Sequence, residues 1–303
     1  MVYSKDFTVI IPHRNSLHLL PKLLDSIPES ERIEVIIVDN SSTPITKNDI
    51  CINRDYKILY SNPERGAGGA RNVGIENALG KWLVFADADD YFTANAFDIF
   101  NSLVDSRAEM IYTMAQGVYL DSGEPSDRGG QYERLVREYC SGKIDEYTLR
   151  FQFSTPWAKM VSHELVNRHN LRYDEVVASN DIFFSLLTGF YARKIVAVEK
   201  MTYIVTVSRG TLTRRRDYQV SVARFEVSLR RNKFLRDNGF SDYQTSIMAR
   251  FRQLCKNGVA ATIQGIKLIV RYRQNPFIGY NRWVTSYKKI KRQERKEIKY
   301  ITH

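Results

Sequence analysis

The feature that most constrains the fold is a short apolar segment followed at once by a cluster of acids. Residues 82–86, WLVFA, are apolar, and three carboxylates follow within four positions, at Asp87, Asp89 and Asp90. A run this short and rich in Trp, Val and Phe predicts a buried strand, and aspartate, a poor strand residue, predicts its end. The acids are therefore expected at the carboxyl end of a buried strand, where open α/β sheets bind ligands.

Three carboxylates this close together repel one another unless a cation lies between them. Hard oxygen ligands of this kind suit Mg²⁺ or Mn²⁺, which also take ligands from substrate phosphates. The alternative is a solvated acidic turn in front of the next helix, with Thr93 as its N-cap. Because Asp-x-Asp alone does not decide between the two, the rest of the chain has to.

Strand and helix patterns alternate over the first 115 residues, which predicts a mostly parallel, doubly wound sheet. The expected strands are 7–11, which Pro12 stops, 33–40, 57–61, 81–86 and 108–114. The expected helices are 20–27 and 94–104, and between them a third helix that the Gly-rich turn 65–69 opens and that runs to about residue 79. Beyond this point we expect a variable segment over 116–150, helices over 155–171 and 180–191, two short strands over 194–208, and helices over 220–238, 243–272 and 281–300.

Charge divides the chain into two parts. Residues 214–303 hold 22 Lys and Arg against 6 Asp and Glu, a net charge of +16, whereas residues 1–213 carry a net charge of −5. A basic, helical C-terminal region of this kind predicts an anionic partner, either nucleic acid or lipid headgroups. The N-terminus lacks signal-peptide features and the three cysteines lie far apart, so we expect a cytoplasmic protein.

Two further features carry a weak signal each. Asp39 ends the predicted strand 33–40, where it could bind the N–H or hydroxyl groups of a ligand or simply form a turn. The glycine-rich stretch 65–69 precedes a helix, whose backbone N–H groups favour an anion, although it matches neither common phosphate-binding fingerprint. Arg71 follows in the expected first turn, where a cation is unfavourable for the helix dipole, which suggests that a ligand needs it.

Taken together and in this order, the features resemble family 2 glycosyltransferases with the GT-A fold. The resemblance runs over roughly the first 213 residues through a series of segments: VIIPHRN from Val9, VDNSS, GAGGARNVG, DADD, TPWAKMVSHELV, LRYDE, SNDIFF and the stretch from Lys194 to Thr213. It implies a catalytic domain over 1–213, with a nucleotide-sugar half up to about 115, an acceptor half from about 150, and a basic helical region over 214–303.

The resemblance also implies roles on the donor side. Pro12 and Asp39 would border the nucleotide base, with Asp39 on the uracil edge, and Arg71 would face the nucleotide. Asp87 would contact the ribose or the metal, and Asp89 would be the ligand of Mn²⁺ or Mg²⁺ that reaches the donor diphosphate. Asp90 is a weaker candidate for this site, and a structural role is the alternative for it.

On the acceptor side, Asp181 matches the second acid of the family's Glu-Asp pair, the usual general base. The first acid is replaced by Asn180, which can hydrogen-bond an acceptor sugar but carries no charge. Trp157 and Lys159 match a Trp-x-Lys element near the acceptor, although a buried core tryptophan is an equal alternative. His13 is a further candidate to line the nucleotide pocket.

The implied activity is metal-dependent, inverting transfer from a nucleotide sugar, expected to be a UDP-sugar, to a glycan or lipid-linked glycan of a surface polysaccharide. A positioned carboxylate would deprotonate the acceptor hydroxyl, and a retaining double displacement would need a second carboxylate at the sugar, for which no clear candidate exists. The alternatives are a sugar-nucleotide-forming nucleotidyltransferase, disfavoured by the loop HRNSLH after the first strand, a nucleic-acid-binding protein, and a pseudo-enzyme that binds the donor but lacks a competent base.

Apolar and basic residues intermingle at helical spacing between residues 247 and 273, and the run KKIKRQERK follows at Lys288. Such helices lie on anionic membrane surfaces or cap a domain with a solvated basic face. A peripheral position on the inner face of the cell membrane would suit a lipid-linked acceptor.

Overall fold

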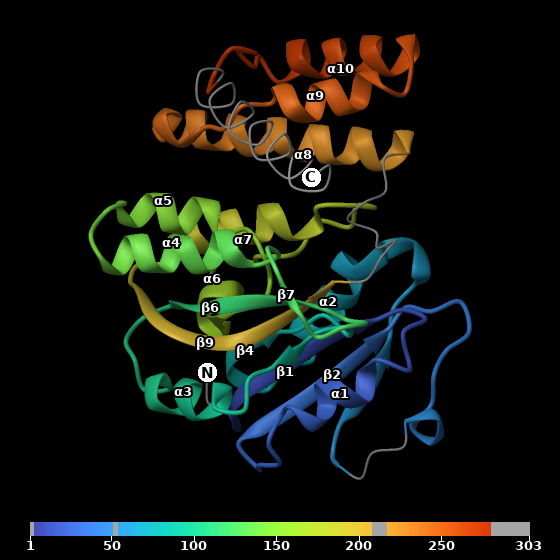
Figure 1. Cartoon of the computed structure of the whole chain (residues 1–303), viewed down its shortest axis with the longest axis vertical. Helices are drawn as coiled ribbons and strands as arrows, with labels where there is room; N and C mark the ends of the chain where they lie inside the picture. Colours follow the sequence, from blue (N-terminus) through green and yellow to red (C-terminus); the bar gives the residue numbers. More distant parts are fainter. Residues whose placement is uncertain (1–2, 51–53, 208–216, 280–303) are drawn as a thin grey trace, which may run out of the picture. The chain divides into compact units, whose positions relative to one another are not determined.

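The computed structural model describes residues 3–50, 54–207 and 217–279. The chain forms two compact units, one made of residues 1–176 with 180–213 and the other of residues 177–179 with 214–303. The first unit contains the β-sheet and the second contains the C-terminal helices, and Figure 1 shows the elements of each. The first unit carries the acids singled out above.

The sheet of the first unit is mixed. Among the described residues its strands lie in the order β3-β2-β1-β4-β8-β6-β9-β5, with β7 on β6. Strands β3, β2, β1 and β4 are parallel, whereas β8 runs antiparallel between β4 and β6. The strands are β1 Lys5–His13, β2 Ile33–Asp39, β3 Lys57–Tyr60, β4 Gly80–Phe85, β5 Tyr91–Phe92, β6 Met110–Tyr119, β7 Pro125–Ser126, β8 Lys159–Ser162 and β9 Ile195–Val207.

Two predictions about the second half of the sheet are wrong. The expected helix over 155–171 is strand β8 followed by a short helix. Strand β8, like the short strands β5 and β7, adds antiparallel pairs to a sheet whose first four strands are parallel as expected. The two short strands expected over 194–208 are the single long strand β9, which pairs with both β6 and β5. Partners that lie far away in the sequence decided both outcomes.

Helices flank the sheet on both sides (Figure 1). The predicted helices near 20–27, 66–79, 94–104 and 180–191 are confirmed, while two helices occupy the segment 116–150 for which only a variable excursion was expected. The helices of this unit are α1 Leu20–Asp25, α2 Gly66–Glu76, α3 Ala96–Leu103, α4 Gly130–Cys140, α5 Glu146–Gln152, α6 His163–Arg168 and α7 Asn180–Tyr191, with short 3-10 turns at Lys47–Asp49 and Pro63–Arg65.

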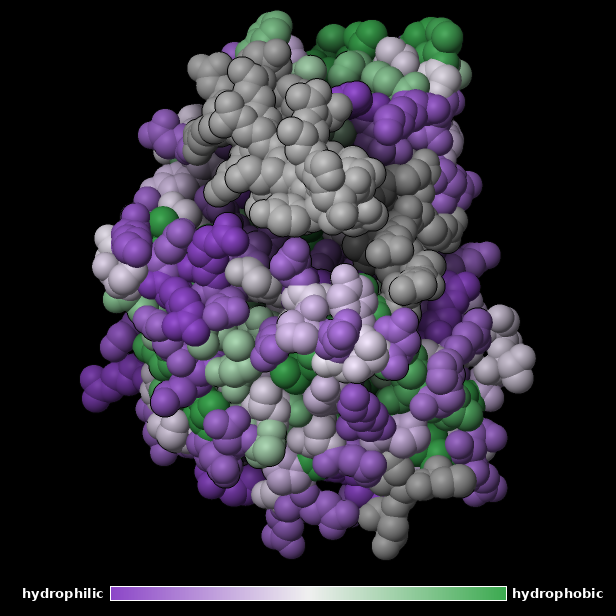
Figure 2. Space-filling view, in the orientation of Figure 1, coloured by the Kyte–Doolittle hydropathy of each residue, from purple (hydrophilic) through white to green (hydrophobic). Residues whose placement is uncertain are grey.

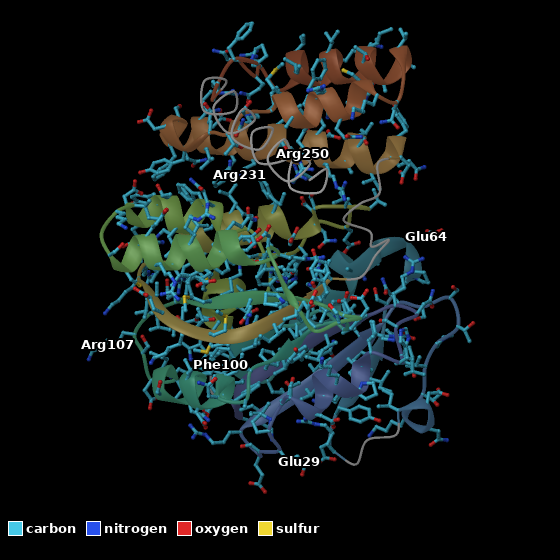
Figure 3. The ribbon with its side chains drawn as sticks, viewed as in Figure 1. Glu29, Glu64, Phe100, Arg107, Arg231 and Arg250 are labelled. Atoms are coloured by element: carbon cyan, nitrogen blue, oxygen red, sulfur yellow. The ribbon has the colours of Figure 1, made fainter. Side chains whose placement is uncertain are left out.

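Aromatic rings anchor α3 to the sheet. Phe7 of β1 contacts the rings of Phe97 and Phe100 at centroid distances of 6.3 and 6.2 Å, and Phe92 of β5 packs edge-on against Phe97 at 5.1 Å. All four rings are buried, and Figure 3 shows Phe100 on α3. Such ring pairs stabilise the fold beyond their buried area, so the strands under the acid cluster rest on a rigid core.

Strand β1 continues through Pro12 to His13, so the prediction that Pro12 ends it is wrong. The carbonyl of Ile10 accepts the N–H of Ala86 on the β4 side, and Pro12 follows Ile10 by two residues and faces the same side. Because β4 ends at Phe85, the N–H that proline lacks has no strand partner to lose there. The extra residues bring His13 into register with Asp39 on β2.

Helix α2 lies close against β1 because it is rich in glycine. A Cβ atom built on Gly74 would lie 2.4 Å from Cγ2 of Ile10, a distance that real contacts do not show. The glycines expected to form a turn before the helix are already helical, since α2 begins at Gly66. Arg71 is therefore in the second turn of α2 rather than the first.

The second unit is a small helical bundle made of α8 Tyr218–Asp237, α9 Met248–Cys255 and α10 Val259–Arg271, with a 3-10 turn at Ser241–Tyr243. Its core consists of Phe225, Leu229, Ile247, Leu254, Ala261 and Leu268. The single helix expected over 243–272 is interrupted by Gly258, which has a φ of 105°. The helix expected over 281–300 lies outside the described residues.

A search of the described residues finds no helix that combines the length and the hydropathy needed to cross a bilayer.

We expect Gly74→Ala to lower the free energy of unfolding by about 1–3 kcal/mol, because the added methyl forces α2 away from Ile10. Chemical denaturation followed by circular dichroism measures this change. Gly130→Ala is the matched control, since a Cβ at Gly130 meets nothing within 4 Å. Equal stability losses in the two variants would show that the α2–β1 contact does not need this glycine.

Candidate active site

The acid cluster sits where the sequence places it, directly after β4. The backbone N–H of Asp87 donates to Oη of Tyr203 on β9 at 2.9 Å, and the N–H of Asp90 donates to the carbonyl of Asp87 at 3.0 Å. The side chain of Asp87 is 28% exposed. Tyr203 and a tight turn thus fix the backbone that presents the acids.

Asp90 has structural contacts, which agrees with the structural role given above as its alternative. Its Oδ1 accepts the N–H of Thr206 at 2.7 Å, and the Thr206 hydroxyl donates to the carbonyl of Asp89 at 2.6 Å. Burial, followed by the charges of Asp89 and Asp87, raises the pKa of Asp90 well above its ordinary value. The residue is buried and ties the acid loop to β9.

The charge of Asp89 is only partly compensated. Burial and the neighbouring Asp87 raise its pKa, and Arg128 opposes the rise only partly. Within the described ranges no Lys, Arg or His nitrogen lies within ion-pair distance of its carboxylate. A carboxylate in this state is a suitable partner for a divalent cation.

The protein residues alone do not complete a metal shell. In the described part of the chain no group of three or more His, Cys, Asp or Glu side chains is arranged to hold a metal ion. This fits Mg²⁺ or Mn²⁺ sites in which one or two carboxylates hold the ion and substrate phosphates supply further oxygens. Asp89, with Asp87 beside it, would hold such an ion.

Arg71 cross-links the acid cluster to helix α7. Its Nη2 donates to Oδ1 of Asp87 at 2.5 Å and its Nη1 donates to Oδ1 of Asn180 at 2.8 Å. Its guanidinium also lies 5.2 Å from the ring centroid of Tyr173. Burial alone would lower the pKa of Arg71, but the negative charges of Asp87 and Asp181 outweigh it and raise the pKa. The guanidinium is therefore a permanent cation that joins the two predicted halves of the site.

Asp181 lies in the first turn of α7, beside Asn180. Burial raises the pKa of its carboxyl, the nearby Asp87 adds to the rise, and the positive charges of Arg71 and Lys159 oppose it. A carboxylate with a raised pKa is a stronger base than a solvated one, which is the property that a general base needs.

The loop that precedes α7 is fastened to α2. The amide of Asn72 donates to the carbonyl of Tyr173 at 3.0 Å and accepts its N–H at 2.8 Å. Arg65 forms a two-bond ion pair with Glu175 at 2.8 and 2.5 Å, and a Cβ on Gly68 would lie 2.0 Å from the Asp174 carbonyl. These positioning roles of Tyr173 and Glu175 were not predicted, although the segment LRYDE around them belongs to the resemblance.

Lys159 is a buried amine next to the candidate base. Its Nζ donates to Oγ of Ser185 on α7 at 2.9 Å and lies 5.7 Å from the ring centroid of Phe153. Burial lowers the pKa of Lys159 to about 7, although the charge of Asp181 works against this shift. Lys159 is therefore close to half-protonated at neutral pH.

Trp157 is a buried core residue, which was one of the two alternatives given above. It is only 3% exposed, its ring stacks on Tyr203 at a centroid distance of 5.6 Å and an angle of 9°, and Tyr132 packs edge-on against it at 5.2 Å. Because Tyr203 accepts the N–H of Asp87, Trp157 supports the acid loop from below rather than offering a face to a sugar.

Asp39 lies at the end of β2, at the same edge of the sheet. Its Oδ1 accepts hydrogen bonds from His13 Nδ1 at 2.9 Å, from the Ser41 N–H at 3.1 Å and from the Ser41 hydroxyl at 2.7 Å. Among the described residues, Oδ2 accepts the Ile45 N–H alone, at 2.9 Å. Burial favours a higher pKa, but these hydrogen bonds outweigh it and hold the pKa of Asp39 below its usual value. Asp39 is thus an ionised carboxylate with acceptor capacity left on Oδ2.

His13 orients Asp39 in this structure. Its Nδ1 contacts Asp39, and its Nε2 accepts the N–H of Ser16 at 3.3 Å. That arrangement corresponds to a neutral ring with the proton on Nδ1. His13, Pro12 and Asp39 are all buried.

A family model agrees with this arrangement. The model of glycosyl transferase family 2 matches residues 8–166, more than half of the chain. The chain belongs to this family. The family predicted from the sequence is thereby confirmed, and the match includes most of β1, the acid cluster and Lys159.

Characterised and uncharacterised bacterial proteins are similar to the chain. Glycosyltransferase GlyA of Streptococcus pneumoniae is 26% identical over 231 residues, which cover 71% of this chain and 32% of GlyA. The EpsH protein of Bacillus subtilis, a suggested glycosyltransferase, is 24% identical over 61% of this chain and 55% of its own length. The chain therefore spans about a third to a half of these two relatives.

Solved structures confirm the predicted GT-A fold. Residues 1–349 of Staphylococcus aureus TarS, crystallised with UDP, superpose with a TM-score of 0.56 at 18% identity, covering 90% of this chain and 72% of that one. The mannosyltransferase PcManGT of Pyrobaculum calidifontis, in complex with GDP-Man and Mn²⁺, gives a TM-score of 0.57 at 15% identity, covering 95% and 88%. At these identities the likeness concerns the fold.

We expect Lys159→Met to change how stability depends on pH. Because the pKa of Lys159 is about 7 in the folded chain and about 10.4 when unfolded, the unfolded chain binds the extra proton between these values. The wild type therefore gains free energy of unfolding, relative to the variant, as the pH rises, by about 1 kcal/mol per pH unit between pH 7.5 and 9.5.

Urea denaturation at several pH values measures this gain. Lys200→Met, at an exposed lysine, is the matched control and should leave the slope of the wild type unchanged. Parallel curves for wild type and Lys159→Met would mean that Lys159 titrates normally.

Proposed function

We propose that the chain is an inverting, metal-dependent glycosyltransferase that moves a sugar from a nucleotide sugar, a UDP-sugar in our proposal, to a glycan acceptor. The observation that carries the proposal is the bridge made by Arg71. This one buried cation contacts Asp87, beside the candidate metal ligand, and Asn180, beside the candidate base. In this proposal Arg71 would hold the donor and acceptor groups of the reaction at a fixed separation.

The donor side combines a partly compensated carboxylate with a neighbouring acid. Asp89 would bind Mn²⁺ or Mg²⁺ together with the diphosphate of the donor, and Asp87 would contact the ion or the ribose. When bound, the ion supplies Lewis-acid stabilisation of the negative charge that develops on the departing diphosphate. The neighbouring folds support this assignment, since TarS was crystallised with UDP and with UDP-GlcNAc and PcManGT with GDP-Man and Mn²⁺.

The nucleotide base would lie at the ends of β1 and β2. Oδ2 of Asp39 keeps an acceptor position beyond its bond to Ile45 and would accept the ring N–H of uracil. Pro12 would border the base, and His13 would hold Asp39 in place from the opposite side. The low pKa of Asp39 keeps it an acceptor at neutral pH.

Asp181 would act as the general base. Its raised pKa makes it a stronger proton acceptor, and the charges of Arg71 and Lys159 oppose that rise. The acceptor hydroxyl would lose its proton to Asp181 while its oxygen attacks the anomeric carbon, and the sugar–phosphate bond breaks on the opposite face. One base on one face produces inversion.

Asn180 gives Arg71 a neutral hydrogen-bond partner in place of the family's first acid. The guanidinium then has Asp87 and Asp181 as its acidic neighbours, and the amide keeps donor capacity for an acceptor sugar. Trp157 and Lys159 are both buried, so their proposed part on the acceptor side is to support Asp87 and Asp181 rather than to touch the sugar.

The biological setting in this proposal is the synthesis of a surface polysaccharide on a glycan or lipid-linked glycan. One curated relative, 23% identical over 69% of this chain, is the succinoglycan biosynthesis protein ExoO of Rhizobium meliloti. We propose a cytoplasmic location, where nucleotide sugars would supply the donor.

We expect Asp89→Ala to abolish metal-dependent donor binding, because it removes the carboxylate that would bridge the ion and the diphosphate. Isothermal titration with UDP in the presence and absence of Mn²⁺ measures this loss, and donor hydrolysis follows turnover. Asp105→Ala is the control, since the Asp105 side chain is 94% exposed. Unchanged Mn²⁺-dependent UDP binding in Asp89→Ala would contradict the metal role.

We expect Asp181→Asn to lower kcat by about 10²–10⁴-fold while UDP binding persists, because the change removes the base and keeps the donor site. Single-turnover transfer measures the chemical step. In the wild type the rate should fall on acidification through a pKa above 3.8, since burial raises the pKa of Asp181. A wild type that binds UDP with Mn²⁺ but transfers or hydrolyses no nucleotide sugar would favour the pseudo-enzyme alternative.

A further inference from the structure

Helix α10 exposes an apolar stripe on the face that points away from its own core. Val259, Ile263, Ile266 and Val270 are 78, 48, 50 and 70% exposed. At about 100° of rotation per residue, positions i, i+4, i+7 and i+11 fall within roughly 60° of one another on the helix surface. Figure 2 shows hydrophobic residues gathered along α10.

The stripe is not the core face of the bundle. Ala261, Gly265 and Leu268 are the buried residues of α10, and they lie on the opposite side of the helix. A Cβ on Gly265 would approach Cε2 of Phe251 to 2.8 Å, so α10 is already packed tightly against α9 through that side. The exposed stripe is therefore additional to what the bundle needs for its own folding.

The charged residues of α10 itself are all basic, and the one acid found beside its flank is Glu226 of α8, 3.8 Å from Arg271 among the described residues. Lys267 and Arg271 lie on one flank of it, about 80–120° around the helix from Val259, and Arg273 follows the helix end. All three are exposed. From residue 243 to residue 293 the sequence contains eleven Lys and Arg and no Asp or Glu. The stripe thus lies in a region with a strongly positive field.

We propose that the stripe of α10 (Val259, Ile263, Ile266 and Val270) docks on an anionic lipid surface. A helix with an apolar face and a basic flank inserts its apolar side chains at the boundary of headgroups and acyl chains, while its cations contact anionic headgroups. The exposed ring of Phe277, just beyond the helix, would add to the apolar contact. This surface belongs to the helical unit, whereas Arg71 belongs to the first unit.

Charge and apolar area together favour an anionic bilayer over a second copy of the chain and over nucleic acid. A second copy of the chain would bring an equally basic flank against Lys267 and Arg271, which costs repulsion unless salt screens it. Nucleic acid would match the cations but would leave Ile263 and Ile266 without an apolar partner. An anionic bilayer satisfies both parts of the surface.

The test is co-sedimentation of the full chain with vesicles of phosphatidylcholine alone or with 30% phosphatidylglycerol. We expect binding to the anionic vesicles, weak binding to the zwitterionic ones, and a loss of binding as salt is raised. Ile263→Gln with Ile266→Gln should weaken binding about tenfold or more, as should Lys267→Glu with Arg273→Glu.

Matched control variants distinguish binding through the stripe from nonspecific adsorption to vesicles. Leu79→Gln with Leu120→Gln changes two apolar residues of similar exposure in the first unit, and Arg107→Glu with Lys200→Glu reverses two exposed charges there. Both controls should bind vesicles like the wild type. UDP binding with Mn²⁺ should be the same in all variants, so vesicle binding is scored independently of the proposed enzymatic activity.

Three results would overturn the proposal. The first is wild-type chain that does not bind anionic vesicles, or stripe variants that bind them as well as the controls do. The second is a dimer in sedimentation equilibrium that Ile263→Gln with Ile266→Gln dissociates, which would make a second copy the occupant. The third is a clear fall in melting temperature for that double variant but not for Leu79→Gln with Leu120→Gln, which would show that the folded chain itself covers the stripe.

Discussion

The buried guanidinium of Arg71 is the interaction on which the candidate site depends. It donates to Asp87 after β4 and to Asn180 at the start of α7, two elements about a hundred residues apart in the chain. A buried cation is costly unless its hydrogen bonds and charge are satisfied, and removing either partner would leave it exposed to that cost. The two sides of the site therefore hold one another in place.

Hydrogen bonds from α2 to Tyr173 and Glu175 fix the loop beside Arg71 and so fix the position of its guanidinium. Asn72 pins the backbone of Tyr173 through two hydrogen bonds, and the guanidinium of Arg71 lies against the Tyr173 ring. Helix α2 can approach the loop that carries these groups because Gly68 lacks a side chain, and it can approach β1 because Gly74 lacks one. Catalytic geometry needs such support, because misplacement by about an ångström costs a large part of the rate.

Around Arg71 the carboxyl groups fall into separate states, and each has a local cause. Asp39 is held ionised by four hydrogen bonds, Asp90 has a strongly raised pKa because it is buried beside two acids, and Asp89 and Asp181 have raised pKa values. Titratable groups whose environments move their pKa values apart are typical of sites that handle protons and charge. Asp39 organises the loop through Ser41 and Ile45, and Asp90 fastens the acid loop to β9.

The sequence by itself determined the parts of the molecule whose signals are local. The apolar run before Asp87, the strand that ends at Asp39 and the helix that begins at Asn180 are each visible in a few consecutive residues, and the motif order then indicates the family. Tertiary structure decided what depends on distant partners. Strand β8 forms between β4 and β6 although its residues were expected to be helical, and β1 passes through Pro12 because β4 ends beside it. Trp157 was left open between a sugar platform and the core, and only its stacking on Tyr203 decided the question. The contact of Arg71 with Asp87 and Asn180 likewise has no local signature, because it arises from the folding of three separate segments onto one edge of a sheet.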